Sequence, residues 1–322
     1  MKNTFLLLTL LACGFVFPYK SFAQAPTDKQ LQAIDKIMAP QRKRVMEILE
    51  ADKTGQYKIY KADLEAFAKA KSPEQQAEHA TQMDRDHKVF VQAAFKAAKI
   101  DLTALKRQVA GILGNSKFTM DEFGGISNES FLPLGPIPQR FMVELSCPFH
   151  VFQDQTNQTL VSNCSGFAND CKLSTTAITE FDGGCRSKAW TGDKFELPGG
   201  NFQKITVSAQ FDAKAWGFAF AIVGYGKAES KFGLRLQGPG FDQLAIVKEV
   251  WCLAPVIWFK RFEFEATDFQ AQVVFTGAFT GGNSFTAQVY NESHAIAVPA
   301  LDAGAADSSA DTFDFIQIVA TN

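Results

Sequence analysis

The chain has 322 residues, about twice the length of an average domain, so two domains are the default expectation. Hydrophobic residues make up 46% and charged residues 20%, which excludes a wholly disordered chain. The formal net charge of −2 lacks the basic excess typical of nucleic-acid binding, so no nucleic-acid partner is expected.

Residues 1–23 have the features of a signal peptide. Lys2 is followed by an apolar stretch from Phe5 to Phe17, and Ser21-Phe22-Ala23 forms a small-x-small cleavage site. An alternative is a lipoprotein modified at Cys13, because Leu10-Leu11-Ala12-Cys13 resembles a bacterial lipoprotein box. No later stretch is apolar enough to form a transmembrane helix. The sequence therefore predicts an exported protein, periplasmic or secreted.

Residues 27–124 are rich in Ala, Lys, Gln and Glu, and their apolar residues recur at helical spacing. An all-α domain is predicted here. Gly and Pro are frequent in residues 125–140, which are predicted to be a linker.

From 141 to 322 the chain alternates apolar and polar residues in short runs separated by turn residues. The pattern is clearest at 269–279, and Gly281-Gly282-Asn283 predicts a hairpin turn. Residues 301–311, which contain three Asp, are predicted to be a flexible acidic loop. The whole region is predicted to be an all-β antiparallel sandwich, jelly-roll-like in topology.

Cleavage after Ala23 leaves five cysteines, and an oxidising compartment favours disulfides among them. Cys164, Cys171 and Cys185 lie close together in a polar stretch, where a disulfide would order a segment that lacks a core. The pairing stays open, and the odd number leaves one thiol unpaired. The five are Cys147, Cys164, Cys171, Cys185 and Cys252.

Residues 50–67 resemble an EF-hand, a helix–loop–helix calcium motif. Placing Asp52 at the first loop position puts Thr54 third, Gln56 fifth and Asp63 twelfth. Fragments at 82–98 and 117–123 resemble a second loop entrance and a third loop exit. The resemblance implies a degenerate EF-hand-like module with calcium as a candidate cofactor, held by Asp52, Thr54, Gln56 and Asp63. Tyr57 occupies the sixth position, where the motif needs Gly, and no unit keeps a full set of ligands.

The sheet region carries few signs of catalysis. His150 and His294 lack a nucleophile motif nearby and are interpreted as surface or capping residues. Glu263 and Glu265 share one strand face, as a glycosidase pair would, but a solvated face explains them more simply. No catalytic residue is assigned.

Trp190 lies in a polar stretch and is expected to be the most exposed of the four Trp, where it would stack on a sugar ring. The leading hypothesis is an exported, non-catalytic binding protein for a glycan or an envelope or extracellular protein. The alternatives are a secreted hydrolase of polysaccharides or esters, with its site in the sandwich, and a calcium sensor or buffer.

Overall fold

The structure is a computed structural model. The residues that it describes are 26–68, 73–113, 124–128, 141–159, 162–180, 183–221, 224–255, 258–298 and 303–321. Four sequence predictions lie wholly or mainly outside these residues: the signal peptide at 1–23, the lipoprotein cysteine Cys13, the loop-exit fragment at 117–123 and most of the linker at 125–140.

The predicted helical region contains helices throughout its described part. They are α1 (Asp28–Glu50), α2 (Gln56–Ala68), α3 (Pro73–Ala97) and α4 (Leu102–Ile112). Helix α1 begins at a capping box, in which the Thr27 side chain accepts from the backbone N–H of Gln30 while the Gln30 side chain accepts from that of Thr27. Asp101 caps α4 by accepting the N–H groups of Thr103 and Ala104. None of these described helices has both the length and the apolar character needed to cross a membrane.

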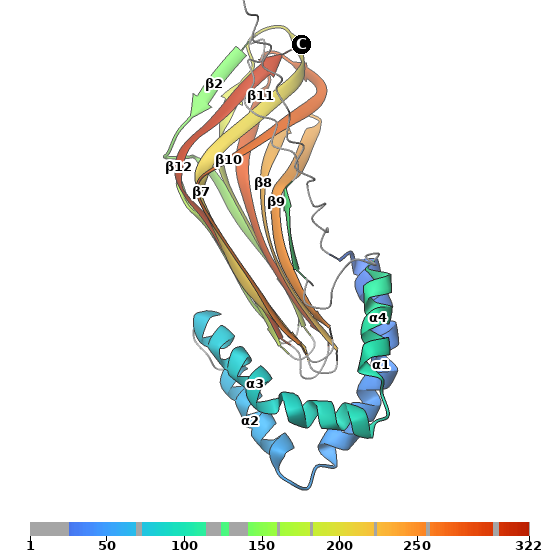
Figure 1. Ribbon diagram of the computed structural model, residues 1–322. Coiled ribbons are helices and arrows are strands. Elements are labelled where there is room, and N and C mark those ends of the chain that lie inside the picture. Colours follow the sequence, from blue (N-terminus) through green and yellow to red (C-terminus); the bar gives the residue numbers. More distant parts are fainter. Residues whose placement is uncertain are drawn as a thin grey trace, which may run out of the picture.

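The rest of the described chain is antiparallel β-structure in two sheets (Figure 1). The order in sheet A is β1-β9-β8-β11-β6-β3; in sheet B it is β10-β7-β12-β5-β4, and β2 pairs with β12. The strands are β1 (Gly124–Asn128), β2 (Phe141–Leu145), β3 (Val151–Gln158), β4 (Ser162–Ala168), β5 (Leu173–Glu180), β6 (Gly183–Glu196), β7 (Asn201–Ala221), β8 (Tyr225–Gly238), β9 (Phe241–Pro255), β10 (Trp258–Thr280), β11 (Ser284–Val298) and β12 (Ala303–Thr321). The prediction of an antiparallel β-sandwich is confirmed.

Two local predictions need correction. The predicted acidic loop at 301–311 is wrong for 303–311, because strand β12 occupies those residues and pairs with both β5 and β7. Residues 124–128, at the start of the predicted linker, form β1 at the edge of sheet A.

The predicted hairpin turn is confirmed, since Gly281 and Gly282 connect β10 to β11 and Gly282 has a φ of 81°.

The interior of the sandwich changes character along its length. From the middle of the sandwich to the end away from the helices, aromatic rings fill the space between the sheets: Phe211, for example, packs with Phe232, Phe269 and Phe313 at centroid distances of 5.4–6.4 Å. Such rings bury much apolar area and favour these tilted and edge-to-face arrangements.

Small and hydroxyl-bearing side chains fill the interior at the end near the helices. Thr175 and Ser308 of sheet B hydrogen-bond to Ser293 of sheet A at 2.9 Å each, and Ser308 also donates to Asn291. A Cβ on Gly304 of β12 would come within 2.7 Å of the Lys227 carbonyl oxygen of β8. The two sheets therefore approach each other too closely here for large side chains.

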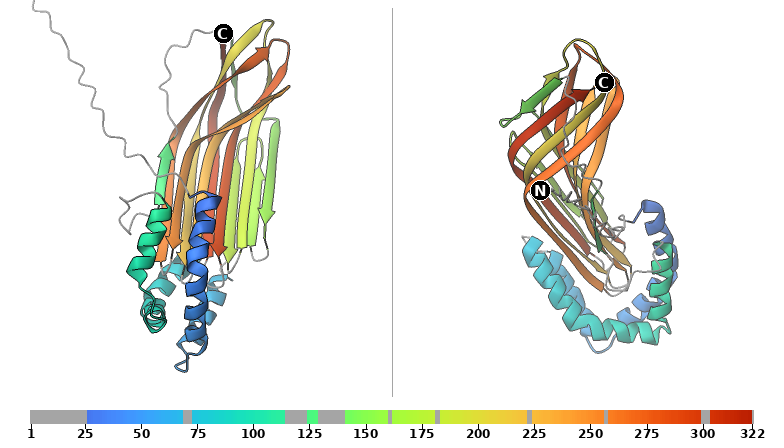
Figure 2. Two further views of the ribbon diagram at one scale, coloured as in Figure 1. Left: turned by 90° about the vertical axis from the view of Figure 1, so that its right-hand side faces the viewer. Right: turned by 45° about the horizontal axis from the view of Figure 1, so that its top comes forward.

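At this same end the large apolar residues lie on the outside of the sandwich. In β7, Phe211 faces the interior, whereas Trp216, Phe218 and Phe220 face outward. Together with Trp251 of β9 they join one hydrophobic cluster with residues of the helices. The helices wrap around this end, with α1 and α4 beside sheet A and α2 and α3 beside sheet B (Figures 1 and 2). The helices therefore bury part of their apolar surface against the outer faces of the sheets, in one shared hydrophobic cluster.

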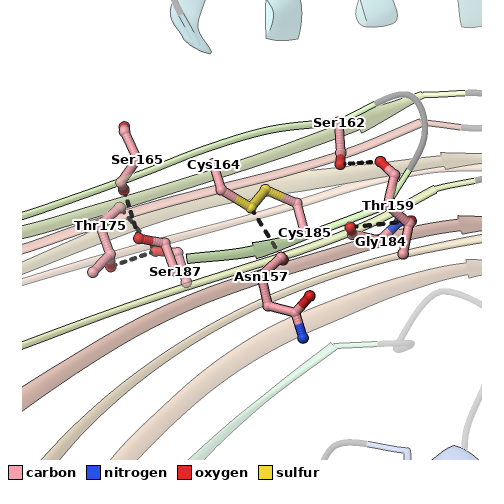
Figure 3. Close-up of a disulfide and its surroundings, with 10 residues drawn as sticks. Asn157, Thr159, Ser162, Cys164, Ser165, Thr175, Gly184, Cys185 and Ser187 are labelled. Atoms are coloured by element: carbon pink, nitrogen blue, oxygen red, sulfur yellow. Dashed lines mark hydrogen bonds between the residues drawn. A yellow bond between two sulfur atoms is a disulfide. The ribbon is translucent and has the colours of Figure 1, made fainter. Parts of the chain in front are cut away.

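Two disulfides link strands and turns near one side of the sandwich. Cys147 pairs with Cys171, and Cys164 of β4 pairs with Cys185 of β6, which joins sheet B to sheet A (Figure 3). Close by, the Ser187 hydroxyl donates to the Ser165 carbonyl oxygen at 2.6 Å. Cys252 is a buried free thiol, and burial raises its pKa. The expectation of disulfides with one thiol left over is confirmed.

Candidate functional site: the polar outer face of sheet A

The predicted calcium ligands lie in the α1–α2 turn and in α2. The Asp52 carboxylate accepts the backbone N–H groups of Thr54 (2.9 Å) and Tyr57 (3.0 Å) and the Thr54 hydroxyl. The N–H of Tyr57 is the main reason that the pKa of Asp52 is lowered. Helix α2 begins at Gln56, which places Gln56 and Asp63 inside the helix.

Asp63 has a partner of its own on a different helix. Its carboxylate Oδ2 lies 2.6 Å from Nε2 of His87 on α3, and the His87 ring packs edge-on against Tyr60. The structure therefore brings Asp52 and Thr54 together and engages Asp63 with α3. Calcium binding stays a prediction.

The residues considered for catalysis lie in different places. Glu263 and Glu265 are exposed on β10, and Glu265 pairs with Lys214 at 2.8 Å, in agreement with a solvated face. His150 is exposed and contacts Asp193 at 2.8 Å. His294 is buried in β11, so its interpretation as a surface residue is wrong.

His294 belongs to a polar face that the strand register builds on the outside of sheet A. The register aligns side chains in rows that cross β3, β6, β11 and β8. The first row is Asn157, Arg186, His294 and Glu229; the second is Gln155, Lys188, Glu292 and Lys231; the third is Gln153, Trp190, Tyr290 and Gly233; the fourth is Val151, Gly192, Gln288 and Arg235. Strand pairing alone thus brings together residues far apart in the sequence, such as Arg186 and His294, which are 108 positions apart.

Charges of opposite sign neutralise one another in the first two rows. Lys231 lies 3.1 Å from both Glu229 and Glu249, the latter on β9. Lys227 lies 3.2 Å from Glu229, and Arg186 lies 3.4 Å from Glu292. Buried ions are tolerated only when they are paired and hydrogen-bonded in this way.

The network shifts the pKa values of its members in opposite directions. Burial by itself would raise the pKa of Glu229, but Lys227, His294 and Lys231 together hold it well below its usual range. Burial and the neighbouring Glu229 raise the pKa of Glu249. Burial lowers the pKa of His294, which favours the neutral imidazole.

Glu229, Glu292 and His294 are close enough to hold a metal ion, with ligand atoms within 4.8 Å of one another. Yet Lys227 and Arg186 already occupy the carboxylates at ion-pair distance. A cation would have to displace these ammonium and guanidinium groups, so the trio fits an ion-pair network better than a metal site.

Trp190 lies in the third row. It is only 7% exposed, so the expectation that it is an exposed platform is wrong. Its ring packs against Tyr290 at a centroid distance of 5.5 Å, and the Arg235 guanidinium lies 5.7 Å from the ring centroid. Asp242 holds Arg235 through two hydrogen bonds of 2.8 and 2.7 Å.

The accessible part of the face is on β3, the edge strand. Its exposed side chains include Gln153, Gln155 and Asn157, which are the β3 members of the third, second and first rows. Next to them on β6 are the half-buried Lys188 and Arg186. The result is a strip of amides backed by two cations, with the edge of Trp190 at one end.

Sequence reasoning identified Trp190 on this face but missed its neighbours. The signals available were the uninterrupted polar run from Gln153 to Gln158 in β3 and the unusual Lys-Ala-Glu-Ser-Lys run at 227–231. Neither shows which strands are adjacent, and only adjacency brings these residues together.

No protein-family model and no curated protein matches the chain. Among solved structures, TmCBM61 in complex with β-1,4-galactotriose is 12% identical, over 48% of this chain and 86% of that chain, with a TM-score of 0.18. The family 11 carbohydrate-binding module from Clostridium thermocellum, in complex with a β-1,3-1,4-mixed-linked tetrasaccharide, is 10% identical over 56% and 96%, with a TM-score of 0.18. TM-scores this low identify no shared function, so what the face binds must follow from its own residues.

Proposed function

We propose that this is an exported, non-catalytic binding protein whose β-sandwich binds a glycan across β3 and β6 on the outer face of sheet A. The observation that carries the proposal is the exposed strip of Gln153, Gln155 and Asn157, continued on β6 by Lys188 and Arg186.

The chemistry of the strip suits sugar hydroxyls. Each hydroxyl both donates and accepts hydrogen bonds, and a side-chain amide offers one acceptor and two donors. Amides on every second residue of a strand lie roughly 7 Å apart, which spaces them along an extended chain of sugars. The cations add donors, and the aromatic pair Trp190–Tyr290 supplies an apolar boundary.

Export is supported by the two disulfides, which form and persist in oxidising compartments. It also fits the predicted signal peptide at 1–23. Cell fractionation distinguishes a periplasmic from a secreted protein, if the disulfide-bonded protein is followed in each compartment.

Binding can be measured by affinity electrophoresis in gels that contain galactan, mixed-linkage β-glucan or xylan. The wild-type protein is expected to be retarded in at least one gel. The triple variant Gln153→Ala, Gln155→Ala, Asn157→Ala should migrate as in a gel without polysaccharide.

Asp154→Ala and Thr156→Ala form the matched control, because these exposed residues alternate with the amides on the same strand. The control should bind like the wild type. Equal retardation of all three proteins would contradict the proposed face, and retardation of none would favour a protein partner instead.

A hydrolase is the second candidate, and one observation favours it. Glu229 and Glu249 are adjacent carboxyl groups whose pKa values are pushed apart, a pattern found in acid–base pairs. Against it, Glu229 is 1% exposed and engaged by two lysines. Release of reducing sugar from any of the three polysaccharides by the wild type, abolished in Glu249→Gln, would establish the hydrolase.

Calcium binding is tested separately. Millimolar calcium should raise the thermal midpoint of the wild type, and Asp52→Ala should lack that response. The absence of any shift in the wild type would remove calcium as a cofactor.

A further inference from the structure

Among the described residues on the outer face of sheet A, two buried polar atoms have neither a hydrogen-bond partner nor an ion-pair partner. They are Nε1 of Trp190 and Oε1 of Gln288, in side chains that are 7% and 3% exposed. Nε of Arg186 and Oε1 of Glu229 on the same face also lack a hydrogen bond, but each has an ion-pair partner, Glu292 at 3.4 Å and Lys231 at 3.1 Å. A buried donor or acceptor without a partner is costly, and native proteins contain few of them. A pair on one face therefore calls for an explanation.

The strand register makes these two residues neighbours. Trp190 of β6 pairs with Tyr290 of β11, and Gln288 lies two residues before Tyr290, opposite Gly192. Diagonal neighbours of this kind have Cα atoms roughly 7–8 Å apart, within reach of long side chains. Position 192 carries no side chain that could separate them, and a Cβ there would overlap the Ala287 carbonyl oxygen.

The surrounding polar groups are already engaged. The Tyr290 hydroxyl donates to Glu292, and Arg235 donates to Asp242 from both Nε and Nη2. Among the described residues, nothing therefore satisfies the indole N–H or the amide oxygen.

The two atoms have complementary requirements. The indole N–H only donates and the amide oxygen only accepts. A carboxylate or phosphate would satisfy the first alone, and an ammonium group the second alone. A hydroxyl satisfies both, because it accepts through a lone pair while it donates its own proton.

We infer that Trp190 and Gln288 together recognise one hydroxyl group of a glycan bound on β3 and β6. This inference rests on the proposed function, since Gln153 of the amide strip pairs directly with Trp190. Trp190 is thus a hydrogen-bond donor to the ligand at the inner edge of the site, in place of the stacking platform expected from the sequence.

The test uses the full-length mature protein and whichever of galactan, mixed-linkage β-glucan and xylan retards the wild type. Trp190→Phe keeps an aromatic ring but removes the N–H, and Gln288→Met keeps the length but removes the amide. Each variant should bind about tenfold more weakly, the loss expected for one buried hydrogen bond. The affinity of the double variant should be no lower than that of the single variant with the lower affinity, because both residues contact the same hydroxyl.

The thermal midpoint of the ligand-free protein separates recognition from a structural role. Gln288→Met should not lower it, since the amide oxygen has no partner in the free protein. Trp190→Phe also removes ring packing against Tyr290, so a modest fall in its midpoint is expected and its affinity carries the test. Trp216→Phe, at the helix-covered end, is the matched control and should leave the affinity unchanged.

Unchanged affinity in both variants, with a wild type that binds, would overturn this inference and leave the proposed function standing. A lowered midpoint with unchanged affinity would likewise assign the pair a structural role. Failure of the wild type to bind any of the three polysaccharides would instead refute the proposed function, and the inference with it.

Discussion

The two ends of the sandwich bury their apolar residues in opposite directions. From the middle of the sandwich to its open end, Phe211 and its neighbours fill the interior. At the end that the helices cover, the interior holds residues such as Ser293 and Ser308, and the large side chains, Phe218 among them, face outward. One long strand, β7, takes part in both arrangements. The comparison shows that alternation in a strand identifies two faces, while the neighbouring elements decide which face is the core.

Truncating one large side chain at each end gives the largest expected effect. Phe211→Ala and Phe218→Ala should each lower the free energy of unfolding by about 3–5 kcal/mol, because both rings are fully buried. Urea denaturation followed by circular dichroism measures the loss. Only Phe218→Ala should also speed limited proteolysis within the helices, since it removes part of their contact surface. Equal proteolysis in both variants would mean that the helices fold independently of the sheets.

The disulfide between β4 and β6 comes next. Removing it with Cys164→Ser and Cys185→Ser should lower the free energy of unfolding by about 3 kcal/mol, because it closes a loop with a sequence separation of 21. Replacing Cys252 with Ala is a control that leaves both disulfides intact. A wild-type midpoint that does not change on reduction would show that packing alone holds the sheets together.

Close approach of the sheets at the helix-covered end predicts a smaller loss. Gly304→Val should cost about 1–3 kcal/mol, because its side chain would press on the β8 backbone at Lys227. Gly199→Val is the control, since a Cβ at Gly199 meets nothing within 4 Å. Equal midpoints for the two variants would contradict the close spacing of the sheets.

The charged face should give a gradual pH dependence. Burial holds the pKa of His294 below its usual 6.5 in the folded protein, so the unfolded chain binds more protons as the pH falls. Stability from this residue is complete above pH 6.5 and is lost as the pH falls below it. Glu229, with its lowered pKa, adds a second loss below pH 4.5. In His294→Gln the decline that begins at pH 6.5 should be absent, as measured by thermal midpoints between pH 7.5 and 5.

Much of the fold could be predicted from the pattern of residues. Helical spacing of Leu31, Ile34 and Met38 predicted the helix now seen as α1, and the alternation at 269–279 predicted part of β10. The acidic run near Asp307 was misread as a loop, because its small and polar residues are typical of loops as well as of a closely spaced pair of sheets.

The candidate site was much less accessible to prediction. Trp190 was singled out as an aromatic residue in a polar stretch, but its burial was not foreseen. Glu229, Gln288 and His294 are polar residues within strands, and nothing in their local sequence shows which of them face one another.

By itself, the sequence determined properties that depend on near neighbours along the chain: where helices and strands form, where the chain turns and which cysteines are available for oxidation. The tertiary structure alone decided how Cys164 and Cys185 pair, which face of β7 is covered and which side chains meet across sheet A. The physical reason is range. Local structure follows from hydrogen bonds and spacing within a few residues, whereas pairing, burial and charge neutralisation depend on strands brought together from distant parts of the chain.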